Sequence, residues 1–159
     1  MREYQIVTHI RVLNYTELND EELELVEKAK EMTQHSYAPY SHFYVGAALR
    51  LSNGIVIPGC NQENAASSTT ICAERSAIFA AGAQYPDQPV MQLAIAARND
   101  NGFMKEVSPP CGSCRQVILE TEQRFHQTIR IYLATRDEVH VVEGINALLP
   151  LQFVAESMI

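Results

Sequence analysis

The sequence is short of positive charge. Twelve lysine and arginine residues stand against 19 aspartate and glutamate residues in 159, which gives a formal net charge of −7. Binding to nucleic acid needs clustered basic side chains on the phosphates, so this balance argues against a nucleic-acid partner. No apolar run approaches the roughly 18 residues that span a membrane, and the first residues, Met1-Arg2-Glu3-Tyr4, have no apolar signal-peptide core. We therefore expect neither a polynucleotide nor a membrane as partner.

Cysteine is also scarce, but three of the four cysteines lie in two short motifs. The motifs are Cys72-Ala73-Glu74-Arg75 and Pro110-Cys111-Gly112-Ser113-Cys114. Three thiolates can hold a tetrahedral zinc ion and leave one position open, where water becomes acidic near neutral pH. Glu74 lies two residues after Cys72, so it can face that open position without being a ligand. We expect one zinc ion per chain, held by Cys72, Cys111 and Cys114, with Glu74 as the catalytic residue.

Both motifs are typical of helix starts. Cys111 and Cys114 are three residues apart and would share one face of a helix, and the residues after Cys72 are rich in helix formers. Zinc with three thiolates carries a net charge of about −1. The positive ends of two helix dipoles, with Arg75 and Gln116, would offset this negative charge.

Two other interpretations of the cysteines remain open. A lone C-x-x-C pair also occurs as a redox pair or as half of a structural zinc site. Structural sites have four ligands, and Cys60 could supply the fourth, although a cysteine at the end of a predicted strand is ordinarily a small buried thiol. In a non-enzymatic zinc-binding protein of this kind, Glu74 would be dispensable.

The remainder of the chain alternates between strand and helix patterns. Asn19 with Glu22 resembles a capping box that opens a helix, and Asn53-Gly54 predicts a tight hairpin turn. This alternation predicts an α/β fold of three layers in a single domain, 1–159, with 1–17 as an N-terminal extension. The predicted strands are 4–13, 44–51, 54–59, 91–97, 129–134 and 138–142, and the predicted helices begin near 20, 72, 111 and 144, the last of them short.

Four segments together resemble the cytidine deaminases of the small, homotetrameric class with a three-cysteine zinc site. Beside the two cysteine motifs, which extend to Arg115 and Gln116, the segments are Tyr37-Ala38-Pro39-Tyr40-Ser41-His42-Phe43-Tyr44-Val45-Gly46-Ala47-Ala48 and Asn61-Gln62-Glu63-Asn64-Ala65. A C-x-E segment followed by P-C-x-x-C is also a known signature of zinc deaminases of nucleobases. The resemblance implies an α/β/α fold with a mixed five-stranded sheet, to which the N-terminal residues would add one strand.

The resemblance also assigns roles by position. It implies that Asn61 and Glu63 hydrogen-bond the ribose hydroxyls and that Phe43 packs on the pyrimidine ring. Phe153 resembles an aromatic residue that reaches a neighbouring subunit's site. Two further implied roles concern the metal side. The backbone N–H of Ala73 meets the pyrimidine carbonyl or the region of the zinc-bound oxygen, and Arg75 and Gln116 hydrogen-bond the zinc thiolates.

The implied reaction is the hydrolytic deamination of cytidine and deoxycytidine to uridine and deoxyuridine in pyrimidine salvage, with Glu74 as base and then acid. The implied protein is a homotetramer with shared active sites. Cysteines committed to zinc favour a reducing compartment, here the cytoplasm. Ser67 departs from the family, which often has a tyrosine at this position. A deaminase of another aminopyrimidine nucleoside, such as a blasticidin-like antibiotic, therefore stays open as an alternative.

Overall fold

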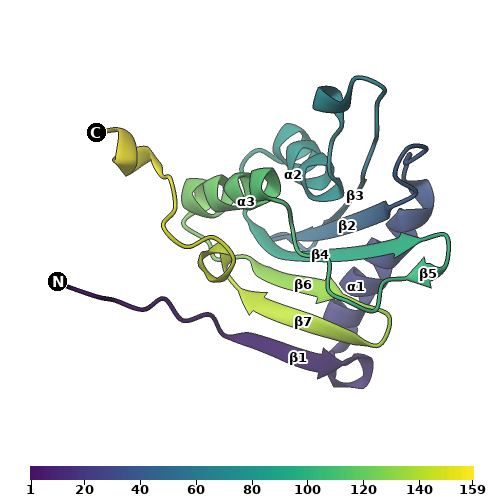
Figure 1. The fold of residues 1–159 in the computed structure, drawn as a ribbon, viewed down its shortest axis with the longest axis horizontal. Coiled ribbons are helices and arrows are strands. Elements are labelled where there is room, and N and C mark those ends of the chain that lie inside the picture. The colour runs from purple at the N-terminus through teal and green to yellow at the C-terminus, as the bar shows by residue number, and fades with distance from the viewer.

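A computed structural model describes all 159 residues and shows one mixed sheet between two layers of helices (Figure 1). The strands follow the order β1-β7-β6-β4-β2-β3, with β5 paired to the end of β4. Only β4 and β6 are parallel, and every other neighbouring pair is antiparallel. The elements are β1 Ile10–Asn14, α1 Asp20–Met32, β2 Tyr44–Leu51, β3 Val56–Cys60, α2 Ala73–Gln84, β4 Val90–Asn99, β5 Gly102–Phe103, α3 Gly112–Phe125, β6 Arg130–Ala134 and β7 Glu138–Glu143.

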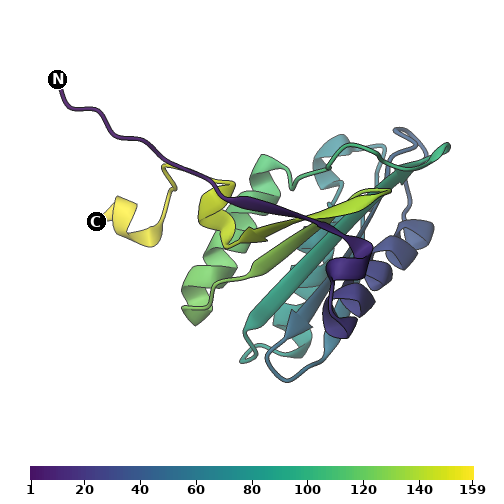
Figure 2. The same ribbon diagram turned by 90° about the horizontal axis from the view of Figure 1, so that it is seen from below.

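The two faces of the sheet bury separate cores. Helix α1 covers one face, and α2 and α3 cover the other, as Figures 1 and 2 show from two directions. Successive side chains of a strand point to opposite faces, and β2 follows this rule. Ala47 and Leu49 belong to the core under α2 and α3, whereas Ala48 belongs to the core under α1. The α/β architecture of three layers is confirmed.

The sheet is larger than the five strands that the resemblance implies. Strand β1 adds the expected N-terminal strand beside β7, and the two-residue β5 adds another. The predicted bounds of the first strand are wrong, because residues 4–9 have no strand structure and the strand ends at Asn14. Ile10 pairs with Val142 near the end of β7, so the residues before Ile10 have no neighbouring strand with which to pair.

The helix predictions hold, with one exception. Asn19 and Glu22 form the expected capping box at the start of α1, with both reciprocal hydrogen bonds at 3.0 Å. Cys72 and Cys111 are the N-cap residues of α2 and α3. The predicted short helix near residue 144 is a single 3₁₀ turn, Ile145–Ala147. After this turn the C-terminal segment projects from the domain on the same side as the N-terminal residues (Figures 1 and 2).

Candidate functional site

Close packing on β3 fixes the start of α2. A Cβ atom at Gly59 would lie 2.5 Å from the carbonyl oxygen of Ala73 and 2.6 Å from the nitrogen of Ala77. Only a glycine therefore allows the first turn of α2 to lie so near the strand. This contact places Cys72 and Glu74 at the edge of the sheet.

The first turn of α3 brings the other two cysteines to the same place. Cys111 caps the helix, and Cys114 lies buried one turn further on. Arg115 fixes the approach to this helix, because its Nε donates a 2.8 Å hydrogen bond to the carbonyl oxygen of Pro110. Two helix N-termini, each with free N–H groups and a positive dipole end, therefore meet at one point.

The three sulfur atoms lie close enough together to coordinate one metal ion. The Sγ atoms of Cys72, Cys111 and Cys114 all lie within 4.8 Å of one another, and those of Cys72 and Cys111 are 3.7 Å apart. Two thiolates that are each about 2.3 Å from a tetrahedral zinc ion lie about 3.8 Å from one another. The donor set and its spacing thus suit the zinc ion that the sequence predicts.

Cys60 is not part of this cluster. Its thiol donates a hydrogen bond to the carbonyl oxygen of His35 at 3.4 Å, and its sulfur accepts one from the side-chain amide of Gln62 at 3.1 Å. The group of possible metal ligands contains only the other three cysteines. The interpretation of a closed four-cysteine site is therefore wrong.

Arg75 and Gln116 behave differently from one another. Arg75 donates from Nη2 to the sulfur of Cys72 at 3.6 Å, while its buried Nε has no hydrogen-bond partner. Hydrogen bonding from Cys114, and then from Arg75, lowers the pKa of the Cys72 thiol, while the same Cys72–Cys114 hydrogen bond raises the pKa of Cys114. The two sulfurs therefore share one proton, which a bound metal ion would displace. Gln116 donates instead to the carbonyl oxygen of Phe153 at 3.0 Å, so in this structure it holds the C-terminal segment.

Glu74 lies beside the sulfur cluster, with only 4% of its surface exposed. Burial raises the pKa of its carboxyl, and the nearby Cys72 thiolate raises it further. A buried carboxyl at an opening beside a metal site has the surroundings of a group that accepts and returns a proton.

A pocket of about 250 Å³ opens onto these groups. It joins the metal side, formed by Cys72, Glu74 and Cys111, to a second side that contains Phe43, Asn61 and Glu63. No lysine or arginine lines it. The structure therefore gathers residues from four separate sequence segments around one cavity.

The second side of the pocket is built from loops at the ends of β2 and β3. The buried Asn61 side chain accepts a hydrogen bond from the backbone N–H of Val45 at 2.8 Å and donates one to the carbonyl oxygen of Phe43 at 2.9 Å. Glu63 accepts from the backbone N–H groups of Tyr40 and Ser41 at 2.9 and 3.3 Å. These bonds hold the pocket wall and leave part of each side chain free for a ligand.

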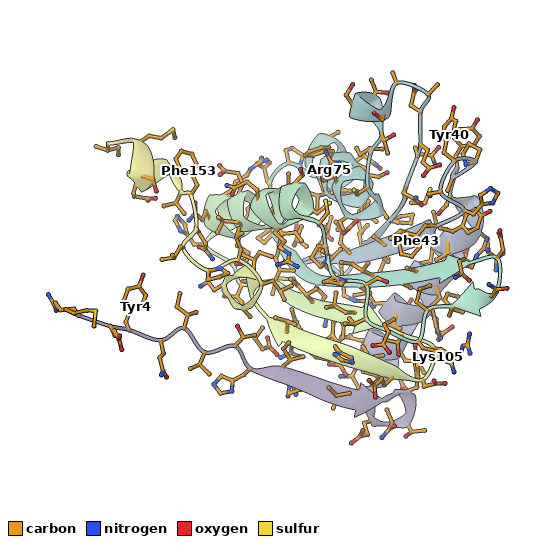
Figure 3. The ribbon with its side chains drawn as sticks, in the orientation of Figure 1. Tyr4, Tyr40, Phe43, Arg75, Lys105 and Phe153 are labelled. Carbon is orange, nitrogen blue, oxygen red and sulfur yellow. The ribbon has the colours of Figure 1, made fainter.

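Several positions singled out in the sequence lie outside the pocket lining, among them the buried Ala73 at the start of α2. Phe153 is 60% exposed on the projecting C-terminal segment, and Figure 3 shows it beyond α3 from Phe43. Ser67 lies exposed in the 3₁₀ turn Ser67–Thr69.

Several lining residues escaped the sequence analysis. Ser41, Thr70 and Ser108 are the polar ones; Ser41 is part of a segment that carries the resemblance, Thr70 stands two residues before Cys72, and Ser108 stands two residues before Pro110. The apolar ones, such as Ile71 and Ile95, looked like ordinary core residues. Their place in the pocket depends on how distant strands pair, which no local pattern shows.

No helix of the structure combines the length and apolar character needed to cross a membrane.

Comparison with known proteins gives concordant matches. The family model described as the cytidine and deoxycytidylate deaminase zinc-binding region matches residues 19–128. A cytidine deaminase of Halalkalibacterium halodurans is 39% identical over 134 residues, which cover 84% of this chain and 95% of that protein. A probable cytidine deaminase of Dictyostelium discoideum is 38% identical over 104 residues, 65% of this chain and 67% of that one.

Solved structures agree with these matches. The crystal structure of a cytidine deaminase from Burkholderia pseudomallei has a TM-score of 0.69 at 37% identity, over 82% of this chain and 97% of the other. The cytidine deaminase from Mycobacterium tuberculosis has a TM-score of 0.64 at 30% identity, over 82% and 95% of the two chains. The N-terminal extension lies before the part that the family model matches.

Proposed function

The chain belongs to the cytidine and deoxycytidylate deaminase family of zinc hydrolases, and from this premise we propose that it deaminates cytidine and deoxycytidine to uridine and deoxyuridine. The observation that carries the proposal is the convergence of three cysteine sulfurs beside the buried Glu74, at the end of a pocket with a polar second side.

Zinc, when bound by Cys72, Cys111 and Cys114, supplies a water nucleophile at neutral pH. Glu74 accepts a proton from the water that attacks C4 of the pyrimidine and passes this proton to N3. It then carries the remaining proton of the new C4 hydroxyl to the amino group, which leaves as ammonia while a carbonyl forms at C4. The backbone N–H of Ala73, in the first turn of α2, donates towards the pyrimidine carbonyl.

The second side of the pocket suits a neutral sugar. Asn61 and Glu63 receive the ribose hydroxyls, and Phe43 packs on the base. An ionised Glu63 and a lining without lysine or arginine disfavour a phosphate group. The substrate class is therefore the nucleoside rather than its monophosphate.

The same proposal covers the assembly and the place of the protein. Residues 1–159 act as one deaminase domain, with 1–17 as an extension, in a homotetramer of pyrimidine salvage in the cytoplasm. The exposure of Phe153 supports shared active sites, because a side chain that projects from its own domain can reach a neighbouring copy. Gln116 would then act by holding the backbone of Phe153 in place.

The direct test is the ultraviolet absorbance change when zinc-analysed protein meets cytidine or deoxycytidine, with Glu74→Gln as the control variant. The variant keeps the shape of the side chain and should keep the zinc, and it should lose about 10²-fold to 10⁴-fold in kcat. Undiminished turnover in Glu74→Gln would overturn the role of this carboxylate.

A second substrate remains open because of Ser67. An exposed serine turn stands where related enzymes often have an aromatic residue. If the protein holds one zinc per chain but does not deaminate cytidine, it should be tested on other aminopyrimidine nucleosides, including blasticidin-like compounds.

A further inference from the structure

The carboxylate of Glu63 is held by one short loop. Its Oε2 accepts hydrogen bonds from the backbone N–H groups of Tyr40 and Ser41, at 2.9 and 3.3 Å. The backbone of Glu63 is tied to the same loop, because its N–H donates to the carbonyl oxygen of Tyr37 at 2.8 Å. The position of this carboxylate is thus set by the conformation of residues 37–41.

Ser41 connects this carboxylate to Phe43. Its Oγ accepts a 3.1 Å hydrogen bond from the backbone N–H of Phe43. This hydrogen bond fixes the turn from which the backbone N–H groups of Tyr40 and Ser41 reach Glu63. Hydrogen bonding from the Ser41 side chain, and then from the Tyr40 backbone, also lowers the pKa of the Glu63 carboxyl. Ser41 therefore joins the backbone of Phe43, through its hydroxyl, to the Glu63 carboxylate, through its own backbone N–H.

The loop is also held by contacts with the turn after β4. His42 has a left-handed backbone with φ of 55°, which is uncommon for a residue other than glycine and typical of conformations that surrounding contacts impose. Asp100, in the turn after β4, contacts Nδ1 of His42 at 3.3 Å and accepts the hydroxyl of Tyr44 at 3.2 Å. These contacts hold the loop on both sides of Phe43, so its hydrogen bonds meet Glu63 in one fixed arrangement.

We propose that Ser41 is a positioning residue for sugar recognition, which orients the Glu63 carboxylate towards the ribose hydroxyls and couples it to the backbone of Phe43. The inference rests on the proposed function, since it concerns the second side of the same pocket, which contains Phe43, Asn61 and Glu63 and is called the sugar side below. Ser41 does not touch the reacting atoms of the base, so its effect is expected in KM and in the selection of the sugar, with kcat almost unchanged.

The test compares two substrates that differ only in the sugar hydroxyls. Cytidine carries the 2′ and 3′ hydroxyls, whereas 2′,3′-dideoxycytidine offers Glu63 nothing to bind. Ser41→Ala should lower kcat/KM for cytidine about threefold to tenfold, the effect of one hydrogen bond, and should leave kcat/KM for the dideoxy substrate within about twofold. Ser41→Thr keeps the hydroxyl and should restore the cytidine value.

Ser68→Ala is the matched control, because Ser68 is an exposed serine outside the pocket lining. This variant should leave kcat/KM unchanged for both substrates. Zinc content and circular dichroism verify that each variant is folded. An equal loss on both substrates, or no loss on cytidine, would overturn the positioning role and leave the deaminase function intact. Failure of the unmodified protein to convert either substrate would instead reject the proposed function.

Discussion

The two sides of the pocket are built in opposite ways. On the metal side, Cys72, Glu74 and Cys114 belong to the starts of two packed helices, and Glu74 and Cys114 are buried. On the sugar side, Glu63 and Ser41 belong to loops, and Ser41 is exposed. Bond-breaking chemistry needs groups that are fixed and dehydrated, whereas a polar sugar can be bound by exposed groups at the mouth of a pocket. Substitutions should therefore have different consequences on the two sides.

The largest effect is expected from Cys114→Ser on the metal side. Because Cys114 is buried, no water molecule can take the place of its thiolate as a ligand. The variant should therefore lose the zinc ion, nearly all turnover and part of its stability. Zinc analysis and thermal unfolding, each before and after treatment with a chelator, measure these losses.

Cys60→Ser is the matched control, since Cys60 lies outside the cluster and its hydrogen bond to His35 suits a hydroxyl as well. It should keep one zinc per chain and its turnover. Equal loss of zinc in the two variants would show that the three-sulfur site is wrongly assigned.

A smaller effect is expected from Glu63→Gln on the sugar side. The variant keeps the zinc and Glu74, but it replaces a charged acceptor of sugar hydroxyls with a neutral amide. Since hydrogen bonds to charged groups contribute about 1.5–3 kcal/mol, kcat/KM for cytidine should fall about tenfold to hundredfold, chiefly through KM. Steady-state kinetics measures this, with Glu120→Gln on the exposed surface of α3 as control. A loss in kcat with KM unchanged would contradict the division between the two sides.

The two sides also differed in how far the sequence predicted them. Cys72, Glu74 and Cys111 act through short spacings at helix starts, and both helices begin where the motifs place them. The sugar side depends on long-range pairing instead. Asn61 faces Val45 only because β2 and β3 lie side by side, and the link from Ser41 to Phe43 follows from a loop conformation with a left-handed His42. The sequence also could not predict that strand β1 begins only at Ile10, because this start depends on where β7 ends.

Gly59→Ala tests the junction between the two sides, because β3 leads to Glu63 while α2 begins at Cys72. The new methyl group would overlap the carbonyl oxygen of Ala73, so α2 must move. The free energy of unfolding should fall by about 1–3 kcal/mol, and zinc should bind more weakly. Chemical denaturation and a zinc titration measure the two effects.

Gly82→Ala provides the comparison within the same helix. A Cβ atom there meets nothing within 4 Å, so alanine should raise the free energy of unfolding by about 0.5–1 kcal/mol. Destabilisation by both substitutions would mean that helix α2 does not pack as the structure places it.

The smallest effect is a difference in pH dependence on the sugar side. Hydrogen bonds from the Ser41 side chain and the Tyr40 backbone lower the pKa of Glu63. A group whose pKa is lowered by folding contributes stability above its ordinary pKa and loses it only as the pH falls through the lowered value. The carboxylate should thus still bind the sugar at a pH where a free glutamate, with a pKa of about 4.3, is half protonated.

The ratio of kcat/KM for cytidine to that for 2′,3′-dideoxycytidine isolates this titration, because ionisations on the metal side affect both substrates alike and cancel. The ratio should stay constant from neutral pH down to the ordinary glutamate range and fall a few-fold only below it. In Ser41→Ala the fall should move to higher pH, since the Ser41 side chain is the first cause of the lowered pKa of Glu63. In Glu63→Gln the ratio should not depend on pH, because the titrating group has been removed. A ratio that falls above the ordinary range in the unmodified protein would mean that the loop does not stabilise the carboxylate, and the sugar side would then be no more fixed than an open surface.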